Sequence, residues 1–294
     1  MKEFYLDFFT KNENFPFHIM YDKHELSFPI HRHMDFSELV IVMSGTATHI
    51  VDNEMFPIKQ GDVFVIGKET LHGYTNAVDF KICNIMFRFE SFLSADYDIK
   101  KAPGFHTLFV LEPYLATIHG FANRLTLSPD DYIKVYDIIH AMMNEYSSDS
   151  DGRVTILQSY FMLLTVMLSR LCDIQGEENR RDIINVANTA AYIERHYTEK
   201  FTLDELAQMS HYSSRHFVRI FTETYHTTPQ KYILSLRLRH ACTMLRDSGM
   251  SVEDIALQSG FGDGNYFSRI FKKYMNMSPK QYRSNAKSNT LPKI

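Results

Sequence analysis

The last hundred residues of this chain contain the same sequence pattern twice. The first copy begins at Thr202 with TLDELAQMSHYSSRHFVRIFTETYHTTPQKYI, and the second begins at Ser251 with SVEDIALQSGFGDGNYFSRIFKKYMNMSPKQYR. Equivalent residues are 49 apart at Thr202 and Ser251 but 50 apart at Pro229 and Pro279, so one copy carries an extra residue at a turn. A solenoid needs several stacked units, and two copies are too few. We therefore interpret the repeat as a duplicated recognition unit.

Each copy predicts a short helix, a tight break and a second helix. In the first copy, Glu205 follows Thr202 by three residues, which is the pattern of a capped helix start. After the break, Phe217, Ile220 and Phe221 lie at spacings of three and four and give the second helix one buried stripe. The second copy repeats these features. Two helices around a tight turn predict a helix-turn-helix motif, whose second helix enters the major groove of DNA.

The motif residues of both copies resemble one family. The first copy reads A-x2-S-x6-F-x-R-x-F-x7-P-x2-Y from Ala207 to Tyr232, and the second reads I-A-x3-G-F-x5-F-S-R-I-F-x6-S-P-x2-Y-R from Ile255 to Arg283. With the helix expected between them, residues 182–285 resemble the AraC/XylS family of bacterial transcription regulators. The resemblance implies that the following residues contact DNA: Ser214, Arg215, Val218, Arg219, Asp263, Gly264, Asn265, Ser268 and Arg269.

The charge of the chain is unevenly distributed. Residues 1–180 hold 15 Lys+Arg and 25 Asp+Glu, a net charge of −10, and residues 181–294 hold 16 and 10, a net charge of +6, which together give the −4 of the whole chain. A basic C-terminal third suits contact with phosphates, and an acidic remainder does not. The simpler alternative is that these basic residues form a solvated surface that contacts no phosphate. The duplicated helix-turn-helix pattern makes this alternative less favoured.

The cysteines and the N-terminus favour a reducing compartment. Cys83, Cys172 and Cys242 are far apart and show neither metal-ligand spacing nor a disulfide framework. The start MKEFYLDFF lacks the apolar run of a signal peptide, and the most apolar stretch, Tyr160–Leu168, is too short to span a membrane. We therefore expect a cytoplasmic protein.

The N-terminal half reads as closely spaced short strands. Turn residues punctuate them at Ser44-Gly45, Asp52-Asn53 and Gln60-Gly61. This pattern predicts a small β-barrel or a double-sheet jelly roll. The expected strands include Glu38–Met43, Thr46–Val51, Asp62–Ile66 and Phe80–Phe87.

Two further motifs lie in this half. One reads H-x-H-x4-E-x6-G and runs from His31 through His33 and Glu38 to Gly45, and the other reads G-x10-H-x3-N and places His72 in its middle. They resemble the two motifs of the cupin fold, although the usual proline and second glycine of the second motif are replaced. In cupin enzymes the four matching ligand positions hold a metal.

Two interpretations of these ligand positions stay open. Three imidazoles and a carboxylate suit divalent Zn, Mn, Fe or Ni. In AraC-type regulators the barrel usually binds an effector, often a sugar, and the same side chains then bind hydroxyl groups without a metal. Nearby aromatic residues would stack on a sugar ring or belong to the core. The candidate effector residues are His31, His33, Glu38, His72, Phe36 and Tyr74, and the first four are also the candidate metal ligands.

Two helices are expected between the barrel and the repeat. Ser128-Pro129 predicts a capped helix running to about Tyr146, and a second helix is expected over 154–173. The second helix carries Leu157, Phe161, Leu164, Leu168 and Leu171 at alternating spacings of four and three. This stripe is either a short coiled-coil seam between subunits or a face packed on the chain's own barrel.

The sequence therefore predicts a two-domain α+β protein with an all-α C-terminal domain. We assign residues 1–104 to a cupin-like effector-binding barrel, 105–174 to a helical dimerisation segment, 175–181 to a linker and 182–294 to an AraC-type DNA-binding domain with two helix-turn-helix motifs. The resemblance is strongest to rhamnose-type sugar-catabolism regulators.

The predicted function is that of a transcription factor and not of an enzyme. The expected partners are double-stranded DNA, a small effector such as a sugar, RNA polymerase and a second copy of the chain, with no membrane. Activation is the usual mode of the family. The rival interpretation is a metal-dependent cupin enzyme with an accessory DNA-binding domain. A third is a regulator whose barrel is only structural. No cofactor is expected apart from the divalent metal discussed above.

Overall fold

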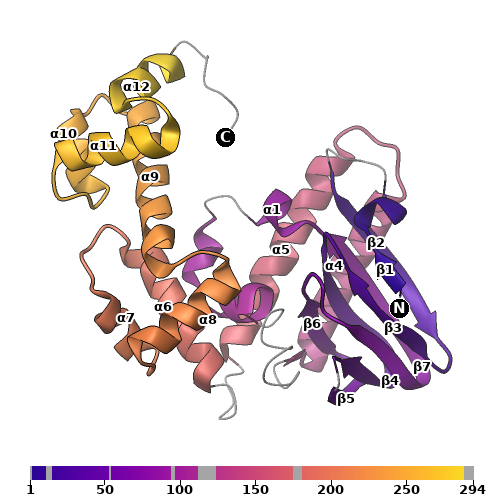
Figure 1. The fold of residues 1–294 in the computed structure, drawn as a ribbon. Coiled ribbons are helices and arrows are strands. Elements are labelled where there is room, and N and C mark those ends of the chain that lie inside the picture. Colours follow the sequence, from indigo (N-terminus) through magenta and orange to yellow (C-terminus); the bar gives the residue numbers. More distant parts are fainter. Residues whose placement is uncertain are drawn as a thin grey trace. The chain divides into compact units, whose positions relative to one another are not determined.

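The computed structural model describes residues 2–10, 15–52, 54–93, 97–111, 124–174 and 181–287 (Figure 1). The chain divides into two compact units, Met1–Ala191 and Tyr192–Ile294. Helix α6 (Arg181–His196) contains the point of division. The predicted linker 175–181 lies outside the described residues, apart from Arg181, which begins α6.

The first unit is built on one eight-stranded sheet. Its strand order is β1-β3-β7-β4-β6-β8, and β2 also pairs with β7 while β5 pairs with β4. All of these pairs are antiparallel except β1 with β3. The strands are β1 (Lys2–Phe4), β2 (Phe17–His24), β3 (Phe28–His33), β4 (Ser37–Val51), β5 (Glu54–Lys59), β6 (Asp62–Ile66), β7 (His72–Phe87) and β8 (Leu125–Thr126).

Strand β4 differs from the sequence-based expectation. The predicted turn at Ser44-Gly45 is wrong, because the two strands expected on either side of it form one continuous strand. The register of β4 against β7 shifts on both sides of Ser44. Gly45 has a φ of 73°, and a Cβ atom there would lie 2.2 Å from the carbonyl oxygen of Val78. Only glycine permits both this conformation and this approach, so it forms a bulge where a turn was expected.

The alternation of β4 divides its side chains between two cores. Leu39, Ile41 and Met43 belong to the core that contains the helices, whereas Val40 and Val42 belong to a second core on the other face. Successive side chains of a strand point to opposite faces. This sheet is therefore buried on both faces, and the second face carries the functional site described below.

Helices of the first unit follow the sheet. Ser128 caps α4 by accepting a hydrogen bond from the backbone amide of Asp131, as its Ser-Pro start predicts. Strand β8 lies in a segment that was expected to be helical, and it pairs with β6. The helices are η1 (Leu6–Phe8), α1 (Phe89–Phe92), η2 (Asp98–Lys101), α2 (Pro103–Phe105), the π-helix η3 (His106–Leu111), α4 (Pro129–Tyr146) and α5 (Arg153–Ile174).

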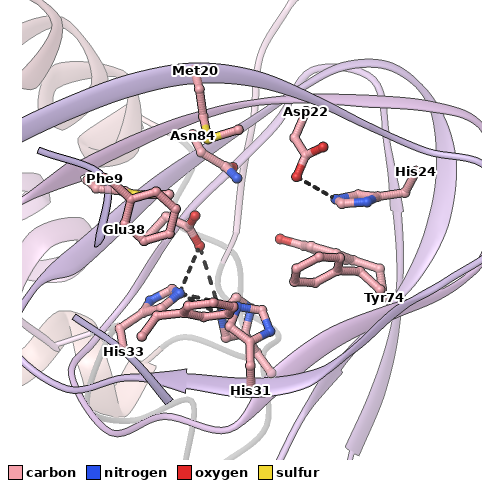
Figure 2. Close-up of a pocket in the computed structure, with 13 residues that line it drawn as sticks. Phe9, Met20, Asp22, His24, His31, His33, Glu38, Tyr74 and Asn84 are labelled. Atoms are coloured by element: carbon pink, nitrogen blue, oxygen red, sulfur yellow. Dashed lines mark hydrogen bonds and ion pairs between the residues drawn. The ribbon is translucent and has the colours of Figure 1, made fainter. Parts of the chain in front are cut away.

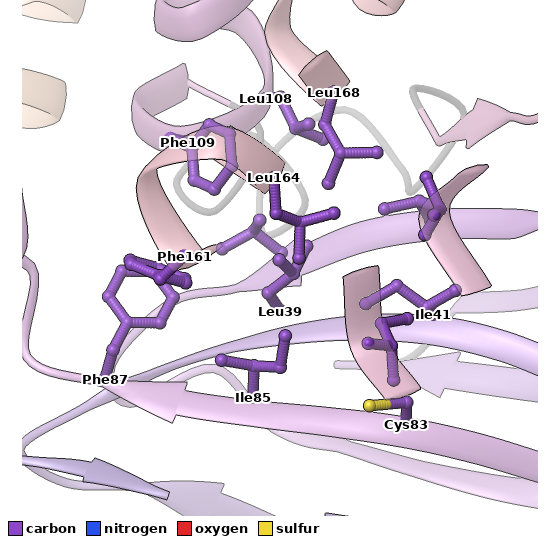
Figure 3. Packing of buried hydrophobic residues seen from close by; sticks show 14 of the residues in the cluster. Leu39, Ile41, Cys83, Ile85, Phe87, Leu108, Phe109, Phe161, Leu164 and Leu168 are labelled. Atoms are coloured by element: carbon purple, nitrogen blue, oxygen red, sulfur yellow. The ribbon is translucent and has the colours of Figure 1, made fainter. Parts of the chain in front are cut away.

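The apolar stripe of α5 packs on the chain's own sheet (Figure 3). Leu157, Phe161, Leu164 and Leu168 are all exposed by 1% or less. The rings of Phe161 and Phe87 lie 4.9 Å apart. Of the two interpretations of this stripe, the structure supports packing on the sheet, because these side chains are already buried within one chain.

Over Arg153–Cys172, α5 is also long and apolar enough, by length and composition, to cross a membrane. That stretch is longer than the apolar run identified in the sequence. A core helix of a folded domain meets the same criterion, and the stripe described above places one face of α5 in the core.

The second unit contains the two predicted helix-turn-helix copies. Thr202 and Glu205 form the expected capping box at the start of the first copy. Ser213 and Asp263 cap the second helix of each copy, and Thr228 caps the connecting helix α9. The helices are α7 (Leu203–Met209), α8 (Ser214–Tyr225), α9 (Pro229–Asp247), α10 (Val252–Gln258), α11 (Gly264–Met275) and α12 (Pro279–Lys287).

Candidate functional site

A cavity of about 100 Å³ lies against the second face of the sheet (Figure 2). Most of its lining comes from β1, β2, β3, β4 and β7. Five of the six predicted effector residues line it: His31, His33, Glu38, His72 and Tyr74. The sheet thus brings both cupin motifs together at one site. Their chemical roles stay predictions.

The three histidines approach one another through their Nε2 atoms. Nε2 of His33 lies 3.3 Å from Nε2 of His31 and 3.3 Å from Nε2 of His72. Nδ1 of His31 lies 3.0 Å from the carbonyl oxygen of Pro29. A protonated Nδ1 would donate to that carbonyl and leave Nε2 free to accept. The Glu38 carboxyl oxygen Oε2 lies 3.8 Å from Nε2 of His33 and 3.9 Å from Nε2 of His72.

Burial makes this cluster predominantly uncharged near neutral pH. It raises the pKa of Glu38 to about 8 and lowers the pKa of His33 to about 3. Burial also lowers the pKa of His31, and it holds the pKa of His72 well below the usual value. The contacts of Glu38 are therefore not ion pairs, and 3.8–3.9 Å is too long for a hydrogen bond. This spacing leaves room for an atom that bonds to both partners.

The two predicted aromatic residues occupy different places. Tyr74 lines the cavity, and burial together with Glu38 and Asp22 holds the pKa of its hydroxyl well above the usual value. Its hydroxyl is therefore protonated and able to donate. Phe36 is fully buried and stacks on His33 with ring centroids 4.4 Å apart. It supports that imidazole and is not among the residues that line the cavity.

Sequence reasoning missed three polar residues of the lining. Asp22 and His24 come from β2, and Asn84 comes from β7. Asp22 and His24 are two residues apart in a strand, so they share the face of Met20, which also lines the cavity. The alternation of β2 was the available signal, but polar side chains at alternate positions usually mark a solvated face.

The histidine cluster fits a divalent metal by its donor atoms. One donor atom from each of His31, His33 and His72 lies within 4.8 Å of the others. Three imidazole nitrogens with a carboxylate form a known set for zinc, manganese, iron or nickel. A metal ligand usually also has a partner for its second ring nitrogen. His31 has one, whereas Nδ1 of His33 and of His72 has none among the described residues.

The predicted DNA-contacting residues of the first copy lie on helix α8. Arg215 and Arg219 are exposed, and Ser214 and Val218 are half-buried. The hydroxyl of Ser214 donates to a carboxylate oxygen of Asp204 in α7, which ties the start of α8 to the preceding helix. Arg215 and Arg219 are four residues apart and therefore share one side of the helix.

The equivalent residues of the second copy lie at and after the start of α11. Asp263 is the N-cap, and its carboxylate accepts hydrogen bonds from the backbone amides of Asn265 and Tyr266 at 2.9 and 2.8 Å. Asn265 and Arg269 are exposed, and Ser268 is half-buried. The guanidinium of Arg269 lies over the ring of Tyr266, 5.7 Å from its centroid. This end of α11 therefore presents an amide and an arginine to solvent.

Gly264, the first residue of α11, is buried against the preceding helix. Its backbone amide donates to Oε1 of Glu253 in α10 at 3.3 Å. A Cβ at this position would lie 1.9 Å from the other carboxylate oxygen of Glu253. Gly264 thus positions the helix and offers only backbone atoms to a partner.

Comparison with known proteins gives two domain families and a set of relatives. Residues 17–86 match the cupin domain family, and residues 206–285 match a helix-turn-helix domain family. The HTH-type transcriptional activator RhaR of Mannheimia succiniciproducens is 26% identical over 87% of each chain. The HTH-type transcriptional activator RhaS of an Enterobacter species is 29% identical over 88% of each chain.

Two of the similar solved structures each cover about a third of this chain. The C-terminal domain of the response regulator yesN from Fusobacterium nucleatum is 36% identical, with 32% of this chain and 93% of that chain covered and a TM-score of 0.32. The DNA-binding domain of AdpA, solved with a target DNA, is 26% identical, with 36% and 95% covered and a TM-score of 0.35.

The fold and the two domain families define a protein with an N-terminal cupin domain, which contains the cavity, and a C-terminal helix-turn-helix domain. Its helix-turn-helix domain is of the AraC type, and its relatives over most of the chain are named HTH-type transcriptional activators. The predicted resemblance to rhamnose-type regulators is confirmed. The rival interpretation as a cupin enzyme has no support from these relatives, which are named transcriptional activators.

Proposed function

We propose that this regulator activates transcription when a small sugar occupies the cupin cavity. The observation that carries the proposal is one chain that combines a buried polar cavity with two helix-turn-helix motifs bearing exposed arginines. The names of the relatives support activation as the mode. RNA polymerase and a second copy of the chain are the proposed protein partners, and the cytoplasm is the proposed location.

On DNA, α8 and α11 are proposed to enter successive major grooves. Arg219 and Arg269 are the proposed base-reading side chains, because arginine binds guanine through two hydrogen bonds. The two contacted segments should have centres about 10–10.5 base pairs apart. Protection of a selected operator by the full chain tests this geometry, and protection confined to one groove segment contradicts it.

A matched pair of variants tests base reading. Replacing Arg269 with Ala should weaken binding to the selected operator by about 1–3 kcal/mol and relax sequence preference at one position. Replacing Lys134, which is exposed on α4 in the N-terminal unit, with Gln is the control. If Arg269 contacts only phosphate, all sequences will weaken alike and the site preference will not change.

In the cavity, the Glu38 carboxyl is proposed to hold a sugar hydroxyl, or a metal that contacts the sugar. Glu38→Gln keeps the size of the side chain but cannot ionise, so it cannot present the two acceptor oxygens of the carboxylate that a bound hydroxyl or metal favours. We expect about tenfold weaker sugar binding and a correspondingly weaker response. DNA binding without sugar should not change, because the substitution lies in the other unit. Glu54→Gln, on an exposed position of β5, is the control.

Calorimetry suits this titration because the chain contains no tryptophan. A panel of L-rhamnose, L-arabinose, D-xylose, D-galactose and D-glucose would be titrated with and without EDTA. Binding that survives EDTA shows that a metal is unnecessary. The effector can shift DNA binding only if the two states of the protein differ in affinity for it. A sugar that binds without changing operator affinity therefore contradicts the regulatory proposal.

A further inference from the structure

The cavity has a second polar end that the cupin motifs do not include. In Figure 2, Asp22, His24 and Asn84 lie on one side of the cavity and His31 and His33 on the other. Oδ2 of Asp22 lies 3.4 Å from Nε2 of His24. The ring of His24 stacks on that of Tyr74 with centroids 5.6 Å apart.

Two buried polar atoms at this end lack partners. The hydroxyl oxygen of Tyr74 and Oδ1 of Asn84 have no hydrogen-bond partner among the described residues. These side chains are only 3% and 7% exposed. Leaving a buried polar atom unsatisfied is unfavourable, because the atom has lost its hydrogen bonds to water without gaining others. The hydroxyl of Tyr74 and the amide group of Asn84 are directed into the cavity (Figure 2), so a bound molecule with hydroxyl groups could form hydrogen bonds with both side chains.

The lining also restricts the charge of that molecule. None of the thirteen described residues that line the cavity is a lysine or an arginine. The side chain of Asp22 lines this end of the cavity and is 32% exposed. A phosphate or carboxylate group on the ligand would approach Asp22 without a fixed cation to balance it. Three phenylalanines in the lining, Phe4, Phe9 and Phe28, provide apolar surface for the C–H face of a sugar ring.

We propose that Asp22, Tyr74 and Asn84 form a second hydroxyl-binding end, so that the effector is an uncharged sugar bridging this end and the histidine–Glu38 end. The inference rests on the proposed function, because it takes the cavity as the effector site. It adds two specificity-determining residues, Asp22 and Asn84. It also excludes sugar phosphates and sugar acids as effectors.

Tyr74→Phe is the sharpest variant, because it removes only an oxygen that has no protein partner. We expect its thermal stability to equal or exceed that of the wild type, while affinity for the neutral sugar that binds best falls about tenfold. Asn84→Leu should behave in the same way. Lys23→Gln, on the exposed side of β2 next to Asp22, is the control and should bind normally.

Matched ligands test the charge restriction in the full-length protein. D-glucose is compared with D-glucose 6-phosphate, and D-galactose with D-galacturonate, alongside L-rhamnose, L-arabinose and D-xylose. We expect measurable binding of at least one neutral sugar and none of the anions, and Asp22→Asn should narrow that difference. Tighter binding of an anion than of its neutral counterpart overturns the inference.

The outcomes separate this inference from the function on which it rests. If Glu38→Gln weakens sugar binding while Tyr74→Phe and Asn84→Leu do not, the second end is wrong and the proposed sensor stands. If no neutral sugar of the panel binds to the wild type, both the sugar-sensing proposal and this inference fail.

Discussion

His211 and Gly260 occupy the same left-handed position in the two helix-turn-helix copies, with φ of 56° and 83°. Each follows the C-cap of the first helix of its copy. In both copies the next residue closes the motif, with Tyr212 donating to the carbonyl of Ala207 at 3.0 Å and Phe261 donating to Ala256 at 2.8 Å. This is a Schellman ending, which glycine favours because it has no Cβ.

The two copies should therefore respond in opposite directions to substitution at this position. His211→Gly should stabilise the C-terminal unit by up to about 1 kcal/mol, because the exposed imidazole is held in a conformation that glycine adopts more easily. Gly260→Ala should destabilise it by about 2 kcal/mol, because the added Cβ would lie 2.6 Å from the carbonyl oxygen of Thr198. Scanning calorimetry of the full chain measures both, and shifts of the same sign would contradict the argument.

Helices α8 and α11, the proposed recognition helices, also differ in charge at equivalent positions. Glu223 of α8 lies 3.4 Å from Arg219, whereas the residue equivalent to Glu223 in α11 is Lys273, which is exposed. Affinity falls as salt concentration rises, and the steepness of this fall is the slope of log affinity against log salt concentration. Lys273→Glu should reduce the steepness by about 1, and Glu223→Lys should increase it by about 1. Binding titrations over a range of salt concentrations measure the slopes. Equal slopes for both variants would show that neither residue lies near phosphates.

Gly45 should be indispensable to the sheet. Gly45→Ala combines a positive φ with contacts of 2.2 Å to the carbonyl oxygen of Val78 and 2.4 Å to the backbone of Asp79. Because both neighbours are backbone atoms of the paired strand, relief requires a shift of β7, and we expect a loss of about 3 kcal/mol or more. Gly249→Ala, where nothing lies within 4 Å of the added atom, is the control. Comparable losses in thermal stability for the two variants would refute the bulge argument.

Local signals explain what the sequence predicted correctly. The hydroxyl-acid pair at Thr202 and the Ser-Pro pair at Ser128 act within a few residues, so the helix starts could be predicted without the fold. The same holds for the cupin motifs, because His31, His33 and Glu38 lie close together in the chain. Only the pairing of β3, β4 and β7 was needed to bring His72 to them.

Features that depend on distant partners were not predictable in the same way. Ser44-Gly45 has the composition of a turn, and only its pairing with β7 makes it a bulge. The stripe on α5 is compatible with a partner subunit or with the sheet until Phe87 and Leu39 are placed against it. Asp22 looks like a solvated position in the sequence of β2, and only the cavity gives it a role.

The packing of α5 leads to a paired prediction. Phe161 contacts the rings of Phe17, Phe87 and Phe92, with centroids 4.9–5.6 Å away. Phe161→Ala should cost about 3–5 kcal/mol of stability by leaving a cavity. Leu163→Ala on the same helix is 51% exposed and should cost much less in a single chain. If Leu163→Ala also lowers stability strongly, and the size of the loss depends on protein concentration, that face of α5 lies in a subunit interface.

The buried carboxyl of Glu38 predicts a distinct pH dependence of stability. Its pKa is raised to about 8 in the folded protein, above the ordinary value of 4.5, so folding favours the protonated form. Its contribution to stability is fully present below about pH 4.5 and is lost as pH rises through about 8, by at most about 1.4 kcal/mol per pH unit. Glu38→Gln cannot ionise and should lack this decline. Buried histidines such as His33, whose pKa is lowered to about 3, act in the opposite direction and lower stability as pH falls below 6.5.

Subtracting the two proteins isolates Glu38, because the histidines are common to both. Denaturation followed by circular dichroism in EDTA, between pH 5 and pH 8, should show the Glu38→Gln variant gaining stability relative to the wild type as pH rises. EDTA matters because a bound divalent metal would favour the ionised carboxylate and remove the trend. If the difference in stability stays constant across this range, the Glu38 carboxyl is solvated or paired in solution. The cavity is then more open than the 3% exposure of Glu38 indicates.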